Sequence, residues 1–329
     1  MKTFSIILPV YNGGELVKQC VNSILSQTCT EFNLLVLDNS SSDGTPEWIQ
    51  ALSDERVRIY SLEHTVSMEQ NWGRIKDIEK NEFITLIGHD DILHPGYLEE
   101  MNQLIEKHPE ASLYQAHYNY IDNKGNFLRS CLPMDEVQYG HEFLACQMTR
   151  TSDSMGTGYL MRSKDYDAIT GMPTHYPNLI FADYQLWVQL SSISYKATSV
   201  KTLFDYRVHQ NVSKTTNGEN YIEAFKLYIG FLNTIKNKPG FHEVINRYGK
   251  DFLMYYCQAL SHRLLKMPKH KRSLRVKEYI EMCTTYAQEL IPQQSFAPLS
   301  RPLIKIAQQL DSNMFGRKLF QGYQKIKRK

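Results

Sequence analysis

The sequence lacks the features that define several large protein classes. Its 329 residues contain no apolar stretch of about eighteen residues, the length that a helix needs to cross a bilayer. The six cysteines include no Cys-x-x-Cys pair, so neither a zinc knuckle nor a disulfide framework is indicated, and we expect reduced thiols. Residues 1–10 show no hydrophobic region with a cleavage site, as a signal peptide would. We therefore expect a protein that is made and kept on the cytoplasmic side.

Strong net charge and glycine-rich phosphate loops are also missing. The formal net charge is only +2, so the sequence does not indicate a nucleic-acid partner. Neither GxGxxG nor GxxxxGK[ST] occurs, which disfavours a dinucleotide or P-loop site. Basic residues are nevertheless concentrated toward the C-terminus, where residues 262–277 contain seven Lys or Arg and no acid.

The first half of the chain has the pattern of an α/β fold. Short apolar runs alternate with segments of helical period, which predicts a sheet flanked by helices. We expect strands at 4–9, 33–38, 57–60, 83–87 and 112–120. We expect helices at 16–25, 45–52, 67–79 and 97–107.

The spacing of apolar residues changes near residue 218. Apolar residues then recur at helical spacing over 221–235, 241–265 and 276–290, with few turn signals. These patterns predict a catalytic domain at 1–217 and a helical C-terminal region at 218–329. The tail from Leu303 to Ile326 has apolar residues at helical spacing among Lys and Arg, which predicts a basic amphipathic helix. Such a helix either docks on the protein or lies on an anionic membrane surface.

Polar loops follow three of the predicted strands. Ligands of open α/β sheets bind beyond the carboxyl ends of the strands, so chemistry is expected in these loops. Asp90 and Asp91 follow one strand, and adjacent carboxylates in a tight turn suit Mg²⁺ or Mn²⁺ together with substrate phosphates. Turn formation and helix capping are the alternative roles for these aspartates. Tyr11, beside the acidic loop 38–44, would suit a nucleobase.

Six ordered segments carry a resemblance to a known family. They are SIILPVYN (5–12), SILSQT (23–28), VLDNSSSDGT (36–45), IGHDDILHP (87–95), ADYQLW (182–187) and DYRVHQNVS (205–213). In these segments the chain resembles the family 2 glycosyltransferases of the GT-A fold over roughly residues 3–215. The implied fold is a Rossmann-like mixed sheet flanked by helices, followed here by the helical C-terminal region.

The resemblance implies a role for each matching residue. Asp183 would be the catalytic base that takes the proton from the attacking hydroxyl. Asp91 and His209 would bind Mn²⁺ or Mg²⁺. The donor would be bound by Pro9, Tyr11, Asp38, Asn39, Asn71, Asp90 and Arg207, with Tyr11 stacked on the base, Asp90 facing the ribose and Arg207 contacting phosphate.

Three positions depart from the family pattern. Asn39, Gly88 and Ala182 stand where many relatives carry an acid. The first departure leaves discrimination of the donor base open. The other two are consistent with a non-catalytic scaffold, which we keep as an alternative. A helix N-cap is the alternative role for Asp183.

The resemblance implies an inverting transfer of a hexose or N-acetylhexosamine from a nucleoside-diphosphate sugar, with UDP as the best match. The acceptor would be a saccharide or a lipid-linked saccharide, as in bacterial enzymes that extend lipooligosaccharide or capsular polysaccharide. A sugar-1-phosphate nucleotidyltransferase is a second alternative. That class would carry a basic, glycine-rich loop after the first strand, whereas here no basic residue precedes Lys18 in that region.

Overall fold

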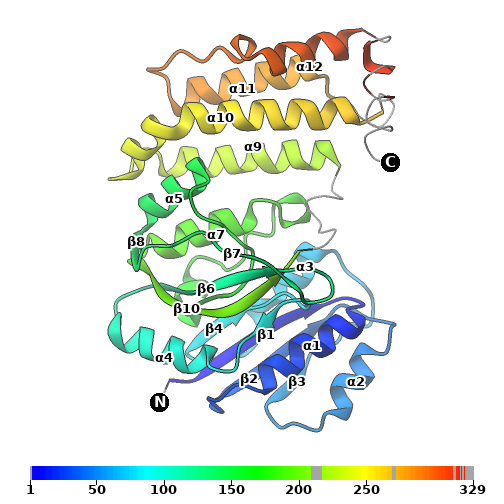
Figure 1. Cartoon of the computed structure of the whole chain (residues 1–329), viewed down its shortest axis with the longest axis vertical. Helices are drawn as coiled ribbons and strands as arrows, with labels where there is room; N and C mark the ends of the chain where they lie inside the picture. Colours follow the sequence, from blue (N-terminus) through cyan, green and yellow to red (C-terminus); the bar gives the residue numbers. More distant parts are fainter. Residues whose placement is uncertain are drawn as a thin grey trace. The chain divides into compact units, whose positions relative to one another are not determined.

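The N-terminal half of the chain folds into alternating strands and helices, as its apolar pattern predicts. The computed structural model describes residues 2–208, 217–268 and 272–313, with 316–318, 320 and 322 beyond them (Figure 1). The chain divides into two units, Met1–Asn211 and Val212–Lys329. The first unit begins with β1 (Phe4–Val10), α1 (Gly14–Leu25), β2 (Phe32–Asp38), α2 (Thr45–Ala51), β3 (Val57–Ile59), α3 (Met68–Gly73), η1 (Arg74–Asp77), β4 (Phe83–Leu86), β5 (Ile92–Leu93) and α4 (Tyr97–Lys107). It continues with β6 (Leu113–Ile121), β7 (Phe127–Ser130), β8 (Val137–Tyr139), α5 (Gly140–Thr149), β9 (Tyr159–Arg162), α6 (Ser163–Ala168), η2 (Pro177–Leu179), α7 (Ala182–Ser191) and β10 (Tyr195–Arg207).

The sheet of the first unit is mixed. Its strand order is β3-β2-β1-β4-β9-β6-β10-β5, with β7 on β6 and β8 on β10. The first four strands of the chain run parallel, and every residue of β1 is buried. Strands covered on both faces by helices read as continuous apolar runs, which is why the sequence located them closely. β9 runs antiparallel between β4 and β6. The predicted mixed sheet flanked by helices is confirmed.

One predicted helix is shorter than expected. The segment 67–79 forms α3 only from Met68 to Gly73, after a capping box at Ser67, and then tightens into the 3₁₀ turn η1. Arg74 begins this turn, and its guanidinium donates to the carbonyl oxygens of Asp38 at 3.2 Å and Tyr60 at 2.6 Å. These bonds tie the end of α3 to the ends of neighbouring strands.

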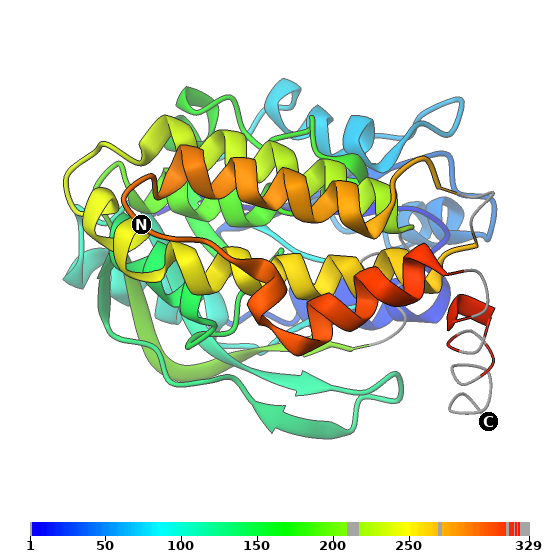
Figure 2. The same ribbon diagram turned by 90° about the horizontal axis from the view of Figure 1, so that it is seen from above.

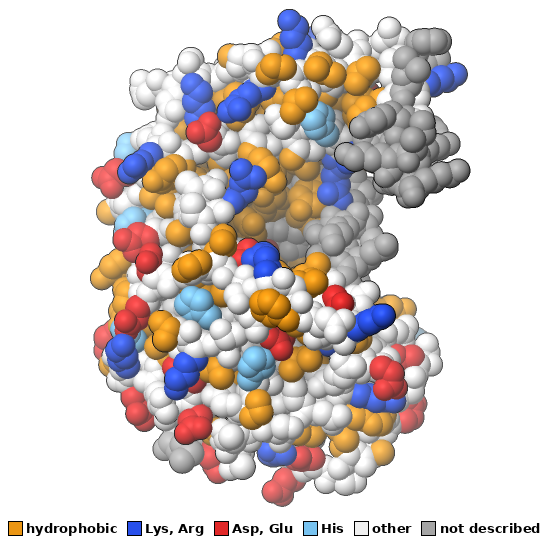
Figure 3. All heavy atoms as spheres, in the orientation of Figure 1, with side chains coloured by type: hydrophobic (Ala, Val, Ile, Leu, Met, Phe, Trp, Pro, Cys, Tyr) orange, Lys and Arg blue, Asp and Glu red, His pale blue; other side chains and the backbone are white. Residues whose placement is uncertain are grey.

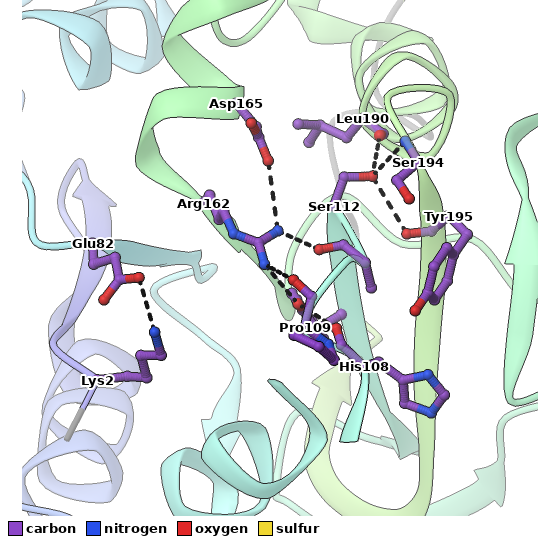
Figure 4. A network of polar contacts seen from close by, with 12 residues as sticks. Lys2, Glu82, His108, Pro109, Ser112, Arg162, Asp165, Leu190, Ser194 and Tyr195 are labelled. Carbon is purple, nitrogen blue, oxygen red and sulfur yellow. Dashed lines mark hydrogen bonds and ion pairs between the residues drawn. The ribbon is translucent and has the colours of Figure 1, made fainter. Parts of the chain in front are cut away.

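A polar network holds the opposite edge of the sheet, where β4, β6 and β10 begin (Figure 4). Arg162, at the end of β9, donates to the carbonyl oxygens of Pro109 and Ala111 and lies 3.8 Å from the carboxylate of Asp165. The Ser112 hydroxyl donates to the carbonyl oxygen of Leu190 at 2.6 Å. This edge is fastened by side-chain bonds to backbone carbonyls, so the carboxyl ends of β1, β2 and β4 are left to form the site.

The second unit is helical. Its described helices are α9 (Gly218–Ile235), α10 (Phe241–Lys266), α11 (Val276–Leu290) and α12 (Pro302–Ser312), with the 3₁₀ turn η4 (Pro298–Ser300) before α12. Figures 1 and 2 show α9, α10 and α11 side by side, and Phe225 of α9 stacks on Tyr256 of α10 with ring centroids 4.6 Å apart. Of the helices in the described ranges, none has the length and apolar character to span a bilayer.

The predicted tail helix is partly described. In α12, Ile304 and Ala307 are fully buried, while Leu303 and Ile306 are 50% and 47% exposed. The helix therefore packs one side into its own unit and leaves apolar side chains at the surface. Figure 3 shows hydrophobic and basic side chains intermixed on this part of the surface. Most of the tail beyond Asn313 lies outside the described residues.

Candidate active site

The polar loops that the sequence predicted to form the site lie together at the carboxyl ends of the parallel strands. In the β1–β2 pair, Val10 lies opposite Asp38, so Tyr11 and the loop after Asp38 leave the sheet at the same edge. β4 lies on the other side of β1 and leads into the turn with Asp90 and Asp91. This arrangement is the edge at which α/β sheets bind ligands.

Asp91 is built into the protein by hydrogen bonds. Its side chain is 2% exposed, its Oδ1 accepts the backbone N–H of Arg207 at 3.0 Å, and its Oδ2 accepts the Thr157 hydroxyl at 2.9 Å. Burial, and next the nearby charge of Asp90, raises the pKa of Asp91 well above its ordinary value. A divalent cation at the pair would remove this electrostatic penalty, because it favours the charged form of both carboxylates.

Asp90 is partly exposed and converges with Asp91 on one space. A Cβ added to Gly88 would lie 3.0 Å from Oδ1 of Asp90 and 2.8 Å from Oδ2 of Asp91. Glycine keeps this space open, where a side chain would collide with both carboxylates. Two hard oxygen donors side by side fit Mg²⁺ or Mn²⁺, which take one or two carboxylates together with substrate phosphates.

No third metal-binding side chain completes the pair within the ranges that the structure describes. His209, the second metal ligand that the sequence predicted, lies outside the described residues. Among the described residues the donor set is therefore the pair Asp90 and Asp91. Such a set relies on phosphate oxygens of a ligand to complete the coordination shell.

The side chain of Arg207 supports the turn that contains Asp90 and Asp91. It is 2% exposed, and Nε donates to the carbonyl oxygen of Asp90 at 2.7 Å. Nη1 donates to the carbonyl oxygen of Asp122 and Nη2 to Oε1 of Gln19, each at 3.0 Å. A guanidinium so engaged positions the aspartate turn rather than facing a ligand. This geometry does not favour the phosphate contact that the sequence predicted for Arg207.

Asp183 lies in the first turn of α7, partly exposed. Burial raises its pKa to about 6, although backbone N–H bonds partly oppose this shift. A Cβ added to Gly156 would lie 3.9 Å from its Oδ2. Leu179 and Phe181, just before α7, have φ angles of 53° and 68°. Left-handed backbone at bulky residues is strained, and such strain is often found where a functional side chain must be positioned.

The pKa of Tyr206 responds to the charges of both the aspartate turn and Asp183. Burial raises its pKa, and the charges of Asp91, Asp90 and Asp183, in that order, raise it further. These carboxylates come from the turn after β4 and from α7, more than ninety positions apart in the sequence. Thr157, whose hydroxyl donates to Asp91, directly follows Gly156, where an added Cβ would lie 3.9 Å from Oδ2 of Asp183. Asp183 and the aspartate turn therefore approach the same short segment from different elements.

The predicted base-binding residues fall into two groups. Tyr11 is 50% exposed at the end of β1, with Pro9 buried beneath it in the strand. Asp38 is 1% exposed, and its carboxylate accepts the Ser41 N–H at 3.3 Å. An exposed ring beside a carboxylate-anchored loop is an arrangement on which a planar base could stack.

Asn39 and Asn71 are buried and bonded to backbone. Asn39 exchanges two hydrogen bonds with the backbone of Val66, each at 2.9 Å. Asn71 donates to the carbonyl oxygen of Leu37 at 3.2 Å and accepts from Arg74 at 2.8 Å. Both amides shape the loop walls, and their predicted contact with a donor stays a prediction.

Three residues that contribute to the site were missed in the sequence. Arg74 supports the Asp38 loop, Thr157 holds Asp91, and Tyr206 lies among the carboxylates. Tyr206 lay inside a segment already singled out, so its proximity to Arg207 was an available signal. The other two had no local signal, because their partners lie 36 and 66 positions away.

Asp153, another acid of the first unit, forms an ion pair with Arg129. Burial acts to raise its pKa, but hydrogen bonds from Arg129 and from the Leu132 N–H outweigh this effect and lower it. Arg129 binds both carboxylate oxygens, at 2.8 Å and 3.0 Å. A bidentate partner makes a carboxylate a poor proton acceptor.

Comparison with known proteins identifies the family. The model of the family Glycosyl transferase family 2 matches residues 5–170. The chain belongs to this family. It is 30% identical to the glycosyltransferase GlyG of Streptococcus pneumoniae over 125 residues, which are 37% of this chain and 42% of GlyG. It is 26% identical over 246 residues to the GalNAc(5)-diNAcBac-PP-undecaprenol beta-1,3-glucosyltransferase of Campylobacter jejuni, covering 72% of this chain and 74% of that protein. The chain thus spans less than half the length of GlyG.

Solved structures support the fold. TarS 1–349 of S. aureus, in complex with UDP-GlcNAc, superimposes with a TM-score of 0.68 at 14% identity, covering 98% of this chain and 91% of the TarS 1–349 chain. The mannosyltransferase PcManGT from Pyrobaculum calidifontis, in complex with GDP-Man and Mn²⁺, superimposes with a TM-score of 0.55 at 12% identity, covering 98% and 88%. The predicted glycosyltransferase fold and enzyme class are confirmed at the level of the family.

Proposed function

We propose that the chain transfers a hexose or N-acetylhexosamine, with inversion, from a UDP-sugar to an acceptor hydroxyl. The observation that carries this proposal is that the adjacent residues Gly156 and Thr157 lie against Asp183 and Asp91 respectively, so that the aspartate turn and Asp183 approach one segment. A sugar transfer needs one centre that neutralises a leaving diphosphate and another that takes a proton from the acceptor. The aspartate turn and Asp183 supply these two centres from different elements.

The aspartate pair fits a divalent cation. Oδ1 of Asp90 and Oδ2 of Asp91 would hold Mn²⁺ or Mg²⁺ over Gly88, with His209 as a further proposed ligand. When bound, the cation would supply positive charge to the departing diphosphate. Asp90 is the more accessible of the two, so we assign it the more direct role. Thr157 and the Arg207 N–H keep Asp91 oriented toward the same space.

Asp183 would act as the base. A carboxylate with a pKa of about 6 is mostly ionised at neutral pH and is still more basic than an ordinary aspartate. Its Oδ2 would accept the acceptor's hydroxyl proton as the oxygen attacks the sugar.

The comparisons support the donor and acceptor classes that we propose. UDP-GlcNAc in S. aureus TarS supports a UDP-sugar donor, and Tyr11 would stack on its base. The undecaprenol-linked substrate named for the Campylobacter jejuni relative supports a lipid-linked saccharide acceptor. We therefore propose action at the inner face of the plasma membrane in the synthesis of bacterial surface polysaccharide or lipooligosaccharide.

A donor panel tests the proposal. The purified chain would be incubated with Mn²⁺ and each common nucleotide sugar, and release of the nucleoside diphosphate would be measured. We expect turnover with a UDP-hexose or UDP-N-acetylhexosamine that stops when EDTA is added. A lack of turnover with every donor would favour the non-catalytic scaffold instead. Pyrophosphate release from UTP and a sugar 1-phosphate would favour a nucleotidyltransferase.

A further inference from the structure

The second unit contains a pocket far along the sequence from the aspartate turn. It has a volume of 570 Å³ and lies where the loop before α11 meets the end of α12. Its lining is rich in basic and amide side chains. The lining residues are Arg272, Ser273, Leu274, Arg275, Lys277, Gln308, Gln309, Asp311 and Ser312.

Asp311, which lines the pocket, is shared by two buried guanidiniums. Arg272 is also in the lining, whereas Arg317 is not a lining residue and donates to the carbonyl oxygen of Met267. The side chains of Arg272 and Arg317 are 3% and 5% exposed, and both pair with Oδ1 of Asp311. The other oxygen of Asp311 accepts the backbone N–H of Val276 at 3.0 Å. Asp311 is therefore fully engaged and balances only one of the two positive charges.

Donor atoms of both arginines lack hydrogen-bond partners among the described residues. These atoms are Nη1 of Arg272 and Nε of Arg317, and both are buried. A buried donor without an acceptor is unfavourable, and a buried uncompensated charge is more so. Burial, and next the charge of Arg272, lowers the pKa of Arg317. An additional anion would satisfy these donors and balance the charge.

The remaining acids near the pocket already have hydrogen-bond partners, and the charge of one of them, Glu219, acts on Arg272 from outside the pocket lining. The Glu219 carboxylate accepts the Leu274 N–H at 3.3 Å and also bonds to Ser273. The Glu278 carboxylate accepts the N–H of Arg275 at 2.7 Å. Neither acid lines the pocket, whereas the exposed cations Arg275 and Lys277 do.

We propose that this pocket binds a phosphoryl group, as a phosphate monoester, a phosphodiester or the free ion. A tetrahedral oxyanion offers several acceptor oxygens to the arginine donors, and the planar guanidinium of Arg272 matches its geometry. The helix α11 is fifteen residues long, and the positive end of its dipole, at its N-terminus, favours an anion in this pocket. The pocket has room for the group that carries the phosphate. This site is independent of the proposed transfer reaction.

The test is binding of inorganic phosphate and pyrophosphate to the full chain. Titration calorimetry and thermal unfolding would be run in EDTA, so that metal-dependent binding at the aspartate turn is suppressed. NaCl at equal ionic strength is the reference. We expect saturable binding and a raised melting temperature. The double variant Arg275→Gln/Lys277→Gln, which changes exposed side chains only, should bind about tenfold more weakly or worse.

Two further variants sharpen the result. Arg272→Met should lose the phosphate-dependent rise in melting temperature, whatever its starting stability. Lys226→Gln, an exposed lysine of α9 paired with Glu223, should bind like the parent. The proposal is overturned if phosphate and pyrophosphate give no saturable binding, or if the double variant binds as well as the parent.

Vesicles distinguish the source of the phosphoryl group. Vesicles of phosphatidylglycerol should be compared with vesicles of phosphatidylcholine in the parent and the double variant. Binding to phosphatidylglycerol that the double variant loses supports a lipid headgroup as the ligand. Binding of the free ions without any difference between vesicles supports a soluble phosphorylated ligand.

Discussion

The two units treat buried charge differently. At the aspartate turn, the buried carboxylate of Asp91 and the buried guanidinium of Arg207 both have protein partners. In the helical unit, Arg272 and Arg317 share Asp311, and buried donor atoms are left over. In the first arrangement each of these two buried side chains has hydrogen-bond partners, whereas in the second some buried donor atoms have none.

This difference separates supporting residues from reacting ones. In the first unit, the fully bonded groups form a rigid base, and the groups that remain accessible are Asp90, Asp183 and Tyr11. Rigid support of this kind keeps reacting groups in a productive geometry. In the second unit, the imbalance itself points to a ligand. Substitutions can break or sharpen this contrast.

A large effect on turnover alone is expected at Asp183. Asp183→Asn should keep donor affinity and lower turnover by about 10²-fold or more, the usual contribution of a positioned base. Turnover and donor affinity would be measured separately. Asp153→Asn is the matched control, because Asp153 is already bound to Arg129, and its turnover should stay within a few-fold of the parent. Equal losses in both variants would remove Asp183 from the role of base.

Variants of Asp90 and Asp91 should differ in their effect on stability, although both should lose metal-dependent donor binding. Asp91→Ala leaves the Thr157 hydroxyl and the Arg207 N–H without their acceptor, so we expect a loss of roughly 2 kcal/mol in the free energy of unfolding. It should also abolish transfer and metal-dependent donor binding. Asp90→Ala should abolish the same binding with a stability loss below about 1 kcal/mol.

Chemical denaturation and calorimetry with donor and Mn²⁺ measure the two effects. If Asp91→Ala binds donor like the parent, the aspartate pair is not the cation site. If Asp90→Ala is the less stable variant, the supporting and reacting roles are exchanged.

The sequence located the parallel strands well and the rest of the sheet poorly. β1, β2 and β4 are continuous apolar runs, whose length and composition distinguish them from surface helices. The strands β8 and β9 are short, and their neighbours are set by pairing over long distances in the chain. Local pattern carries no information about such partners.

The site was predictable in its residues but less so in their roles. The ordered segments identified Asp90, Asp91 and Asp183, and in the structure the aspartate turn and Asp183 approach one short segment. The orientation of Arg207 was not predictable, because its partners lie up to 188 positions away. A residue type states which bonds a side chain can make, and only the fold decides which of them it makes.

The pH dependence of turnover should reflect the raised pKa of Asp183. The base must be ionised to act, and its folded-state pKa is about 6, raised by burial. Turnover should therefore be constant above that pH and fall about tenfold per unit below it. The measurement is the turnover number at saturating donor and acceptor between about pH 5 and 8. A profile that stays level down to about pH 5 would mean that another group takes the proton.

The smallest effect is expected at the surface of α12. Leu303 and Ile306 are about half exposed, whereas Ile304 and Ala307 are buried in the helical unit. A truncation after Pro302 would remove these buried residues and Asp311 together with the exposed ones, so it would not test membrane attachment alone. The double variant Leu303→Ser/Ile306→Ser removes only exposed apolar surface. If α12 contributes to attachment at an anionic leaflet, this variant should co-sediment a few-fold less with anionic vesicles at low salt, with an unchanged melting temperature. Binding by the parent should weaken as salt is raised. If the parent remains in the supernatant at low salt, the exposed face of α12 does not contact a membrane, and its apolar side chains serve the fold alone.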